Sequence, residues 1–244
     1  MSPTLHCHST PPAPVLAALA LSLLAVTNAG ATPSVRYSWD DCSPIVTNKN
    51  WSGPGTYVQV LAAVGLEPGV QSMTFGIGVG VVRDAWSFSD SRGDYFCQPY
   101  SRFALSTSGT GCAAAPLTSF SFEHGIGITD PRHGYKLSVN FDPGFVPDPA
   151  VRYTVARLAF DHSHSVAGFA APGSGNCGQV DEGECFALGY ATYSGGGPGG
   201  ELPLESDFLT WQDFNANLYP GARPCPAAVP TRSATWGAIK SQYR

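Results

Sequence analysis

Alternation of apolar and small residues is the clearest pattern along this chain of 244 residues. Between residues 70 and 82, every odd position from 73 onward is apolar, while the even positions from 72 to 80 carry serine, threonine or glycine. A period of two predicts a strand with one buried face and one nearly bare face. The same alternation predicts strands at residues 56–64, 120–128 and 135–141.

Shorter segments extend this interpretation to most of the chain. Further strands are expected at residues 35–39, 102–106, 151–164, 184–193 and 206–212. Clusters of proline, glycine and aspartate separate them, and no amphipathic helix intervenes. The sequence therefore predicts an all-β fold, an antiparallel β-sandwich of the immunoglobulin-like or jelly-roll kind.

The first 31 residues resemble a secretory leader. An uncharged start is followed by an apolar run at residues 15–26 and by Ala29-Gly30-Ala31, an order typical of a cleaved signal peptide. We expect a signal peptide at 1–31, a β-sandwich domain at 32–219, and a Pro-rich segment with a short C-terminal helix at 220–244. The apolar run is too short to cross a bilayer comfortably, so we expect a secreted, extracytoplasmic protein with no membrane span.

Charge narrows the class of partner. The formal net charge is -5, and charged residues make up only 13% of the chain, without a long basic block. Nucleic acids and anionic membranes attract clustered positive charge, so neither is an expected partner. An extracellular polysaccharide or a protein fits this composition better.

Six cysteines follow the leader, and an even number in an oxidising compartment indicates disulfides. No C-x-x-C motif occurs, which argues against a structural zinc site. Six cysteines allow 15 pairings. We expect a disulfide-stabilised domain in which Cys177 pairs with Cys185, Cys97 with Cys112, and Cys42 with Cys225.

One segment offers candidate metal ligands. Asp161, His162 and His164 lie at the end of a predicted strand, where residues two apart project from the same face. The two imidazoles and a carboxylate could hold a divalent metal, the only cofactor that the sequence suggests. The alternative is a polar strand end with solvated histidines. No residue is assigned a catalytic role.

Rows of glycine on two predicted strands form the second candidate site, a ligand-binding face. Glycine weakens a strand, so its repeated use indicates that another group approaches the backbone closely. That group could be a flat polysaccharide, a partner's strand, or another segment of this chain. The residues of this predicted ligand-binding face are Gly76, Gly78, Gly80, Gly125 and Gly127, with Trp51 and Trp86 as a stacking platform for sugars.

Three short motifs resemble those of uncharacterised secreted β-rich proteins from environmental bacteria. They are SWDDC at residues 38–42, DHSHSV at 161–166, and the tail TWGAIKSQYR at 235–244. The resemblance implies a secreted bacterial β-protein. It implies no activity and no catalytic residues.

Functional hypotheses follow from what is present and what is missing. The chain has no G-x-S-x-G, H-E-x-x-H or phosphate-loop motif. We therefore favour a secreted, non-catalytic β-sandwich that binds or displays at the cell surface or on extracellular polymer, with a carbohydrate or protein ligand. One alternative is an extracellular hydrolase, either metal-assisted or acting on polysaccharide. Another is a structural component of an extracellular assembly, which would show an open strand edge or an apolar docking face.

Overall fold

The computed structural model of the chain describes residues 31–80, 84–86, 103–124, 134–171, 174, 176–197 and 199–214. They belong to one compact unit, Ala31–Arg244, and form two β-sheets plus a 3-10 turn, η2, at Asp84–Trp86. The predicted antiparallel β-sandwich is confirmed. The predicted signal peptide, up to residue 30, and the predicted C-terminal helix lie outside the described residues.

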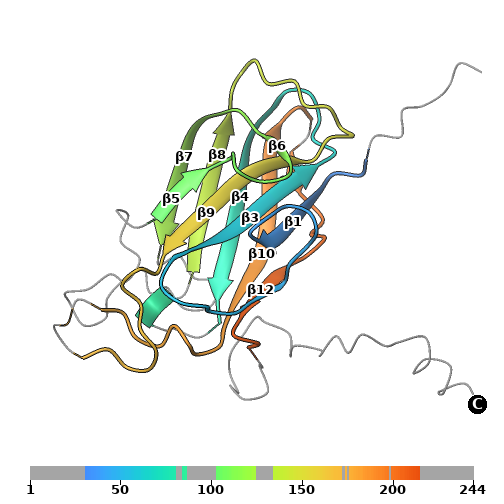
Figure 1. Cartoon of the computed structure of the whole chain (residues 1–244). Coiled ribbons are helices and arrows are strands. Elements are labelled where there is room, and N and C mark those ends of the chain that lie inside the picture. The colour runs from blue at the N-terminus through green and yellow to red at the C-terminus, as the bar shows by residue number, and fades with distance from the viewer. Residues whose placement is uncertain are drawn as a thin grey trace, which may run out of the picture. The chain divides into compact units, whose positions relative to one another are not determined.

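The first sheet has the strand order β1-β3-β9-β5, with β6 also paired to β9 (Figure 1). Its neighbours are antiparallel except for β6 and β9. The strands span Ser34–Trp39 (β1), Thr56–Val64 (β3), Phe103–Ser106 (β5), Ala113–Ala114 (β6) and Tyr153–Asp161 (β9).

The second sheet has the order β2-β12-β10-β4-β8-β7, with β11 also paired to β10. Only β2 and β12 are parallel to each other. Its strands span Asn48–Lys49 (β2), Val70–Val79 (β4), Leu117–His124 (β7), Gly134–Phe141 (β8), Glu184–Gly195 (β10), Gly200–Glu201 (β11) and Phe208–Trp211 (β12). The sequence did not predict β2, β6 or β11, because two residues are too few to show a period.

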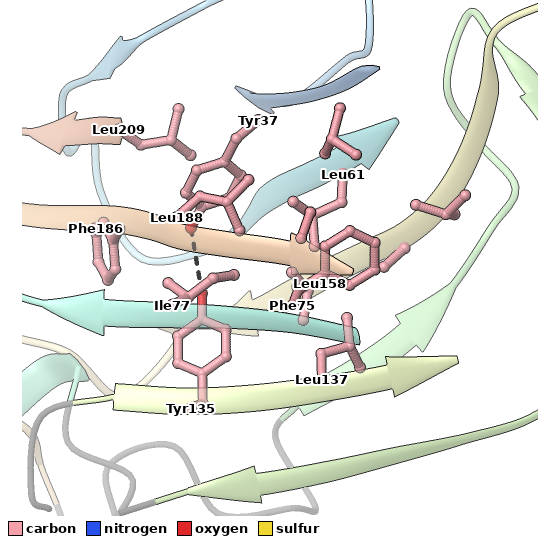
Figure 2. Close-up of a cluster of buried hydrophobic side chains, with 14 of the residues drawn as sticks. Tyr37, Leu61, Phe75, Ile77, Tyr135, Leu137, Leu158, Phe186, Leu188 and Leu209 are labelled. Carbon is pink, nitrogen blue, oxygen red and sulfur yellow. Dashed lines mark hydrogen bonds between the residues drawn. The ribbon is translucent and has the colours of Figure 1, made fainter. Parts of the chain in front are cut away.

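The main hydrophobic core lies between the two sheets (Figure 2). Phe75, Ile77 and Leu137, which the alternation placed on apolar faces, are fully buried there. Leu61 and Leu158 join the same cluster from the first sheet. Burying one such side chain contributes roughly 1.5–3 kcal/mol relative to leaving it in water, so the core is the main source of stability.

A polar contact crosses this core. The Tyr37 and Tyr135 hydroxyls donate to Gln59 Oε1 at 2.6 and 2.5 Å, and the two hydroxyl oxygens lie 3.3 Å apart (Figure 2). Burial raises the pKa of both tyrosines above the usual value. Because a buried hydroxyl without a partner is costly, this network favours one placement of β1 and β3 against β8.

A smaller apolar cluster lies on the outer face of the first sheet. Val58, Val60, Ala62 and Ala159 pack there with Cys42. Both faces of β3 are therefore covered, which explains why eight of its nine residues are buried. A sandwich strand usually has one solvated face.

A disulfide between Cys42 and Cys112 joins two segments that cover this outer face. The Asp41 carboxylate strengthens the link by accepting hydrogen bonds from the backbone N–H groups of Cys42 and Gly111. The predicted pairs Cys97–Cys112 and Cys42–Cys225 are therefore wrong. Cysteine spacing does not show that packing on β3 brings the sulfur atoms of Cys42 and Cys112 together.

The remaining cysteines are only partly described. Cys177 and Cys185 are each disulfide-bonded, and their predicted pairing with each other stays a prediction. Cys97 and Cys225 lie outside the described residues.

No helix in the described part of the chain is long and apolar enough to cross a membrane.

Candidate functional site

The two sheets share an open edge formed by β5 and β7. Within the described residues, β5 pairs only with β9 and β7 pairs only with β8, so each strand has one backbone edge that no other strand pairs. The chain crosses between them at Ala115 and Pro116, where Ala115 N–H donates to Thr154 O and Pro116 O accepts from Asp142 N–H. Figure 1 shows β5 and β7 along the same side of the sandwich.

A groove of about 700 Å³ runs along this edge. We call it the edge groove; its lining comes from residues 105–107 and 114–120. Leu105 and Leu117 form the inner part of the groove and pack against the main core. Ala115, which also lines the groove, is buried. None of the lining residues is charged, so the groove suits an uncharged group.

Phe120 contributes an exposed aromatic side chain to the lining of this groove. Its cross-strand partner Val139 is buried in the core, which places Phe120 on the same face of β7 as Phe122. The Phe122 ring stacks on Tyr135 with centroids 5.2 Å apart, whereas Phe120 is 53% exposed. Large apolar side chains exposed next to a groove mark interaction sites more often than isolated ones do.

The nearest described ion pair lies at the far end of β7. Lys136 Nζ and Glu123 Oε1 are 3.6 Å apart, and both side chains are partly exposed. An exposed pair of this kind contributes little to stability. Its position leaves residues 117–122 uncharged.

The predicted metal ligands are not brought together. Strand β9 ends at Asp161, so His162 and His164 lie in the following turn and not on one strand face. His162 is buried and His164 is exposed. Among the described residues, no group of three or more His, Cys, Asp or Glu side chains is arranged to hold a metal ion.

His162 instead belongs to an aromatic cluster. Its ring lies 4.3 Å from that of Trp86 and 5.6 Å from that of Tyr57, between centroids. Its Nδ1 shares a 2.8 Å hydrogen bond with Ser165 Oγ. Burial lowers the pKa of His162 to about 4, although the neighbouring Asp161 carboxylate acts in the opposite direction. A neutral imidazole in such a place serves packing.

The glycine face of β4 is occupied by the chain itself. A Cβ atom on Gly76 would lie 2.2 Å from Cε1 of Tyr190, a residue of the neighbouring strand β10. The backbone is therefore closely approached here, but by a tyrosine ring and not by a polysaccharide. Gly78 is buried at the end of the same strand, and Gly80 follows it.

The two tryptophans of the predicted ligand-binding face do not form an exposed platform. Trp86 is 2% exposed and packs against Phe160 and Phe186, so it is not available to stack on a sugar. Trp51 is partly buried against the main core. Gly125 and Gly127 lie outside the described residues.

No family model and no curated protein matches this chain. The chain is similar to a cohesin module from a Clostridium perfringens family 33 glycoside hydrolase, at 10% identity over 74% of this chain and 98% of that one, with a TM-score of 0.36. It is also similar to the second type II cohesin module of the cellulosomal adaptor ScaA scaffoldin of Acetivibrio cellulolyticus, at 10% identity, 71% and 92% coverage and a TM-score of 0.40. For the seventh ScaB type I cohesin of Pseudobacteroides cellulosolvens the values are 12% identity, 73% and 90% coverage and a TM-score of 0.33.

The sequence did not reveal the edge groove. Alternation placed Phe120 and Phe122 on one apolar face, and the structure agrees about the face. What decides exposure is that β7 ends its sheet, and strand order is not contained in a period-two pattern. Composition gave no signal either, because edge strands usually carry charges or proline, whereas residues 117–122 carry neither.

Proposed function

We propose that this chain is a secreted, non-catalytic binding module that takes up an extended segment of a protein partner at the edge groove. The observation that carries the proposal is the combination of an uncharged groove, at the last described strand of the second sheet, with the exposed Phe120 that lines it. An added strand would pair with the backbone of β7 and place alternate side chains in the groove, the arrangement known as β-augmentation. Covering the exposed part of Phe120 would contribute about 1 kcal/mol.

The polar face of the second sheet supports a protein ligand over a carbohydrate one. Its hydroxyl groups already hydrogen-bond to each other: Ser72 with Ser194 at 2.7 Å, and Thr74 with Ser138 at 3.1 Å. Cross-strand pairs of this kind stabilise the sheet itself. A sugar would have to compete with these bonds, whereas the edge groove offers apolar surface from Leu105, Leu117 and Phe120.

The chemistry of the groove supports a non-catalytic role. Its lining holds no histidine, carboxylate, lysine or cysteine, the groups that act as general acids, bases or nucleophiles. Serine and threonine hydroxyls are present, but no lining residue could serve as their base. Binding is therefore the activity that these residues fit.

A peptide selection tests the proposal. The purified chain would be screened against a library of linear peptides, in parallel with a Phe120→Asp variant and a Phe169→Asp control. Phe169 is also largely exposed (77%), but it lies between β9 and β10 in the chain and does not line the groove. We expect uncharged, β-prone peptides that bind the wild type and the control but not Phe120→Asp. Peptides that ignore the Phe120 substitution, or binding of soluble glycans in place of peptides, would contradict the proposal.

A further inference from the structure

Arg157 of β9 has no counter-ion among the described residues. It forms no ion pair with them, and its buried Nε has no hydrogen-bond partner. A partly buried charge without a counter-ion is unfavourable. The other described arginines and lysines each have a carboxylate nearby: Arg36 and Arg152 contact Glu205, Lys49 contacts Asp40, and Lys136 lies 3.6 Å from Glu123. Arg157 is therefore the described cation best suited to a carboxylate from outside the chain.

The strand register places Arg157 beside one end of the edge groove. Arg157 lies directly opposite Ser106 of β5 in the antiparallel pair. Residues paired in this way project from the same face of the sheet, with Cβ atoms about 5 Å apart. Ser106 and the following Thr107 both line the groove. Because an arginine side chain is longer than this spacing, a carboxylate just outside this end of the groove is within its reach.

The segment between β5 and β6 packs close to the stem of Arg157. A Cβ atom on Gly109 would lie 3.7 Å from Nε of Arg157. The segment is itself fixed at Thr110, whose hydroxyl oxygen lies 2.6 Å from that of Thr154, and at the disulfide-bonded Cys112. The arginine nevertheless remains partly exposed. A guanidinium whose stem is already ordered loses less conformational entropy when it binds a ligand.

We propose, on the basis of the proposed function, that the segment bound in the edge groove is flanked by an acidic residue whose carboxylate pairs with Arg157. The uncharged part of the segment lies against Leu105, Leu117 and Phe120, and the carboxylate lies outside the groove beside Ser106. The planar guanidinium can donate two parallel hydrogen bonds to one carboxylate. Arg157 thus favours partners whose apolar stretch is flanked by Asp or Glu, and disfavours partners with Lys or Arg at that place.

Charge-extended peptides test this specificity. An uncharged peptide selected by the wild type would be synthesised with blocked termini and one added residue, Glu, Gln or Lys, at its first or its last position. Fluorescence anisotropy would measure binding to the wild type, Arg157→Gln, Arg157→Lys and Lys136→Gln, at about 0.05 M and about 1 M salt. Lys136→Gln is the matched control, because it removes the same charge from a side chain that does not line the groove. Arg157→Gln should keep the urea midpoint of the wild type, since the guanidinium has no described partner to lose.

We expect Glu at one of the two positions to tighten binding to the wild type about three- to tenfold relative to Gln, and Lys to weaken it. This gain should disappear in Arg157→Gln, persist in part in Arg157→Lys and in full in Lys136→Gln, and shrink at high salt.

Three results would overturn the inference: no gain from Glu in the wild type, an equal gain in Arg157→Gln, or a gain lost equally in Lys136→Gln, which would indicate general charge attraction. If the uncharged peptide still binds through Phe120 in these cases, only the pairing with Arg157 fails. If no peptide binds the wild type, the proposed function fails with it.

Discussion

Acidification is expected to destabilise the protein through one buried side chain, His162. Its side chain is fully buried, and Nε2 has no hydrogen-bond partner among the described residues. Burial lowers its pKa to about 4, in part opposed by the Asp161 carboxylate, from an ordinary value of 6.5. The folded protein therefore resists protonation at a pH where an unfolded chain would accept the proton.

The sign and size of the effect follow from this difference. Well above pH 6.5 the imidazole is neutral in both the folded and the unfolded state, so it does not change the free energy of unfolding. As the pH falls from 6.5 toward 4, the unfolded chain binds a proton that the folded protein does not, so the free energy of unfolding decreases. The full loss is about 3 kcal/mol below pH 4, and about 2 kcal/mol of it is already present at pH 5.

Urea unfolding monitored by tryptophan fluorescence would measure this loss between pH 7 and pH 5. The wild type is compared with His162→Phe, which keeps an aromatic ring beside Tyr57 and Trp86 but cannot be protonated. His164→Gln serves as a control at an exposed histidine. The His164 variant should lose stability as the wild type does, and the His162 variant should lose about 2 kcal/mol less. An unchanged pH dependence in His162→Phe would refute the reasoning.

Three further predictions concern stability. Gly76→Ala should lower the free energy of unfolding by about 1–3 kcal/mol because its Cβ overlaps the Tyr190 ring. Adding Tyr190→Ser should restore part of this loss in thermal unfolding. If it restores nothing, the overlap with Tyr190 is not the cause of the loss. Replacing Cys42 and Cys112 together by serine opens a link between residues 70 apart in sequence, which should cost about 4 kcal/mol in denaturant unfolding; a loss below about 1 kcal/mol would be inconsistent with it. Partial burial raises the pKa of Glu205, but hydrogen bonds from a serine and two arginines outweigh this effect and lower the pKa to about 2. Glu205→Gln should therefore be less stable than the wild type at pH 6, and the difference in the free energy of unfolding should shrink as the pH falls from about 4.5 toward 2. A difference that stays constant with pH would argue against this cause.

The strands were predictable because their burial has a simple period. Phe75, Ile77 and Leu137 were placed on apolar faces from sequence, and all are fully buried. Period-two burial depends only on residues close in the chain, so a single sequence is sufficient to detect it. The same reasoning identified the close approach to the backbone at Gly76, although it could not name Tyr190 as the group involved.

Features that depend on residues far apart in sequence were not predictable. The link between Cys42 and Cys112 exists because two covering segments meet on the outer face of β3, and sequence spacing does not show which segments cover a sheet. Phe120 is exposed because β7 is the last strand of its sheet, which requires the strand order.

The histidine pair shows how one boundary changes a candidate site. With the strand extended to residue 164, His162 and His164 would share a face and could chelate a metal. The strand ends at Asp161 instead, and the turn directs His162 into the aromatic cluster while His164 remains exposed. Because strand ends are the least certain part of a sequence-based assignment, a site that depends on them is uncertain too.

Amide hydrogen exchange of the chain, alone and with a selected peptide, tests the central claim that the edge of β7 binds an extended protein segment. Backbone amides that gain a strand partner become protected, so bound peptide should slow exchange in residues 117–124 and 103–106. The exposed loop around Val146 should exchange equally in both samples. Protection confined to other strands, or no protection at saturating peptide, would contradict the account.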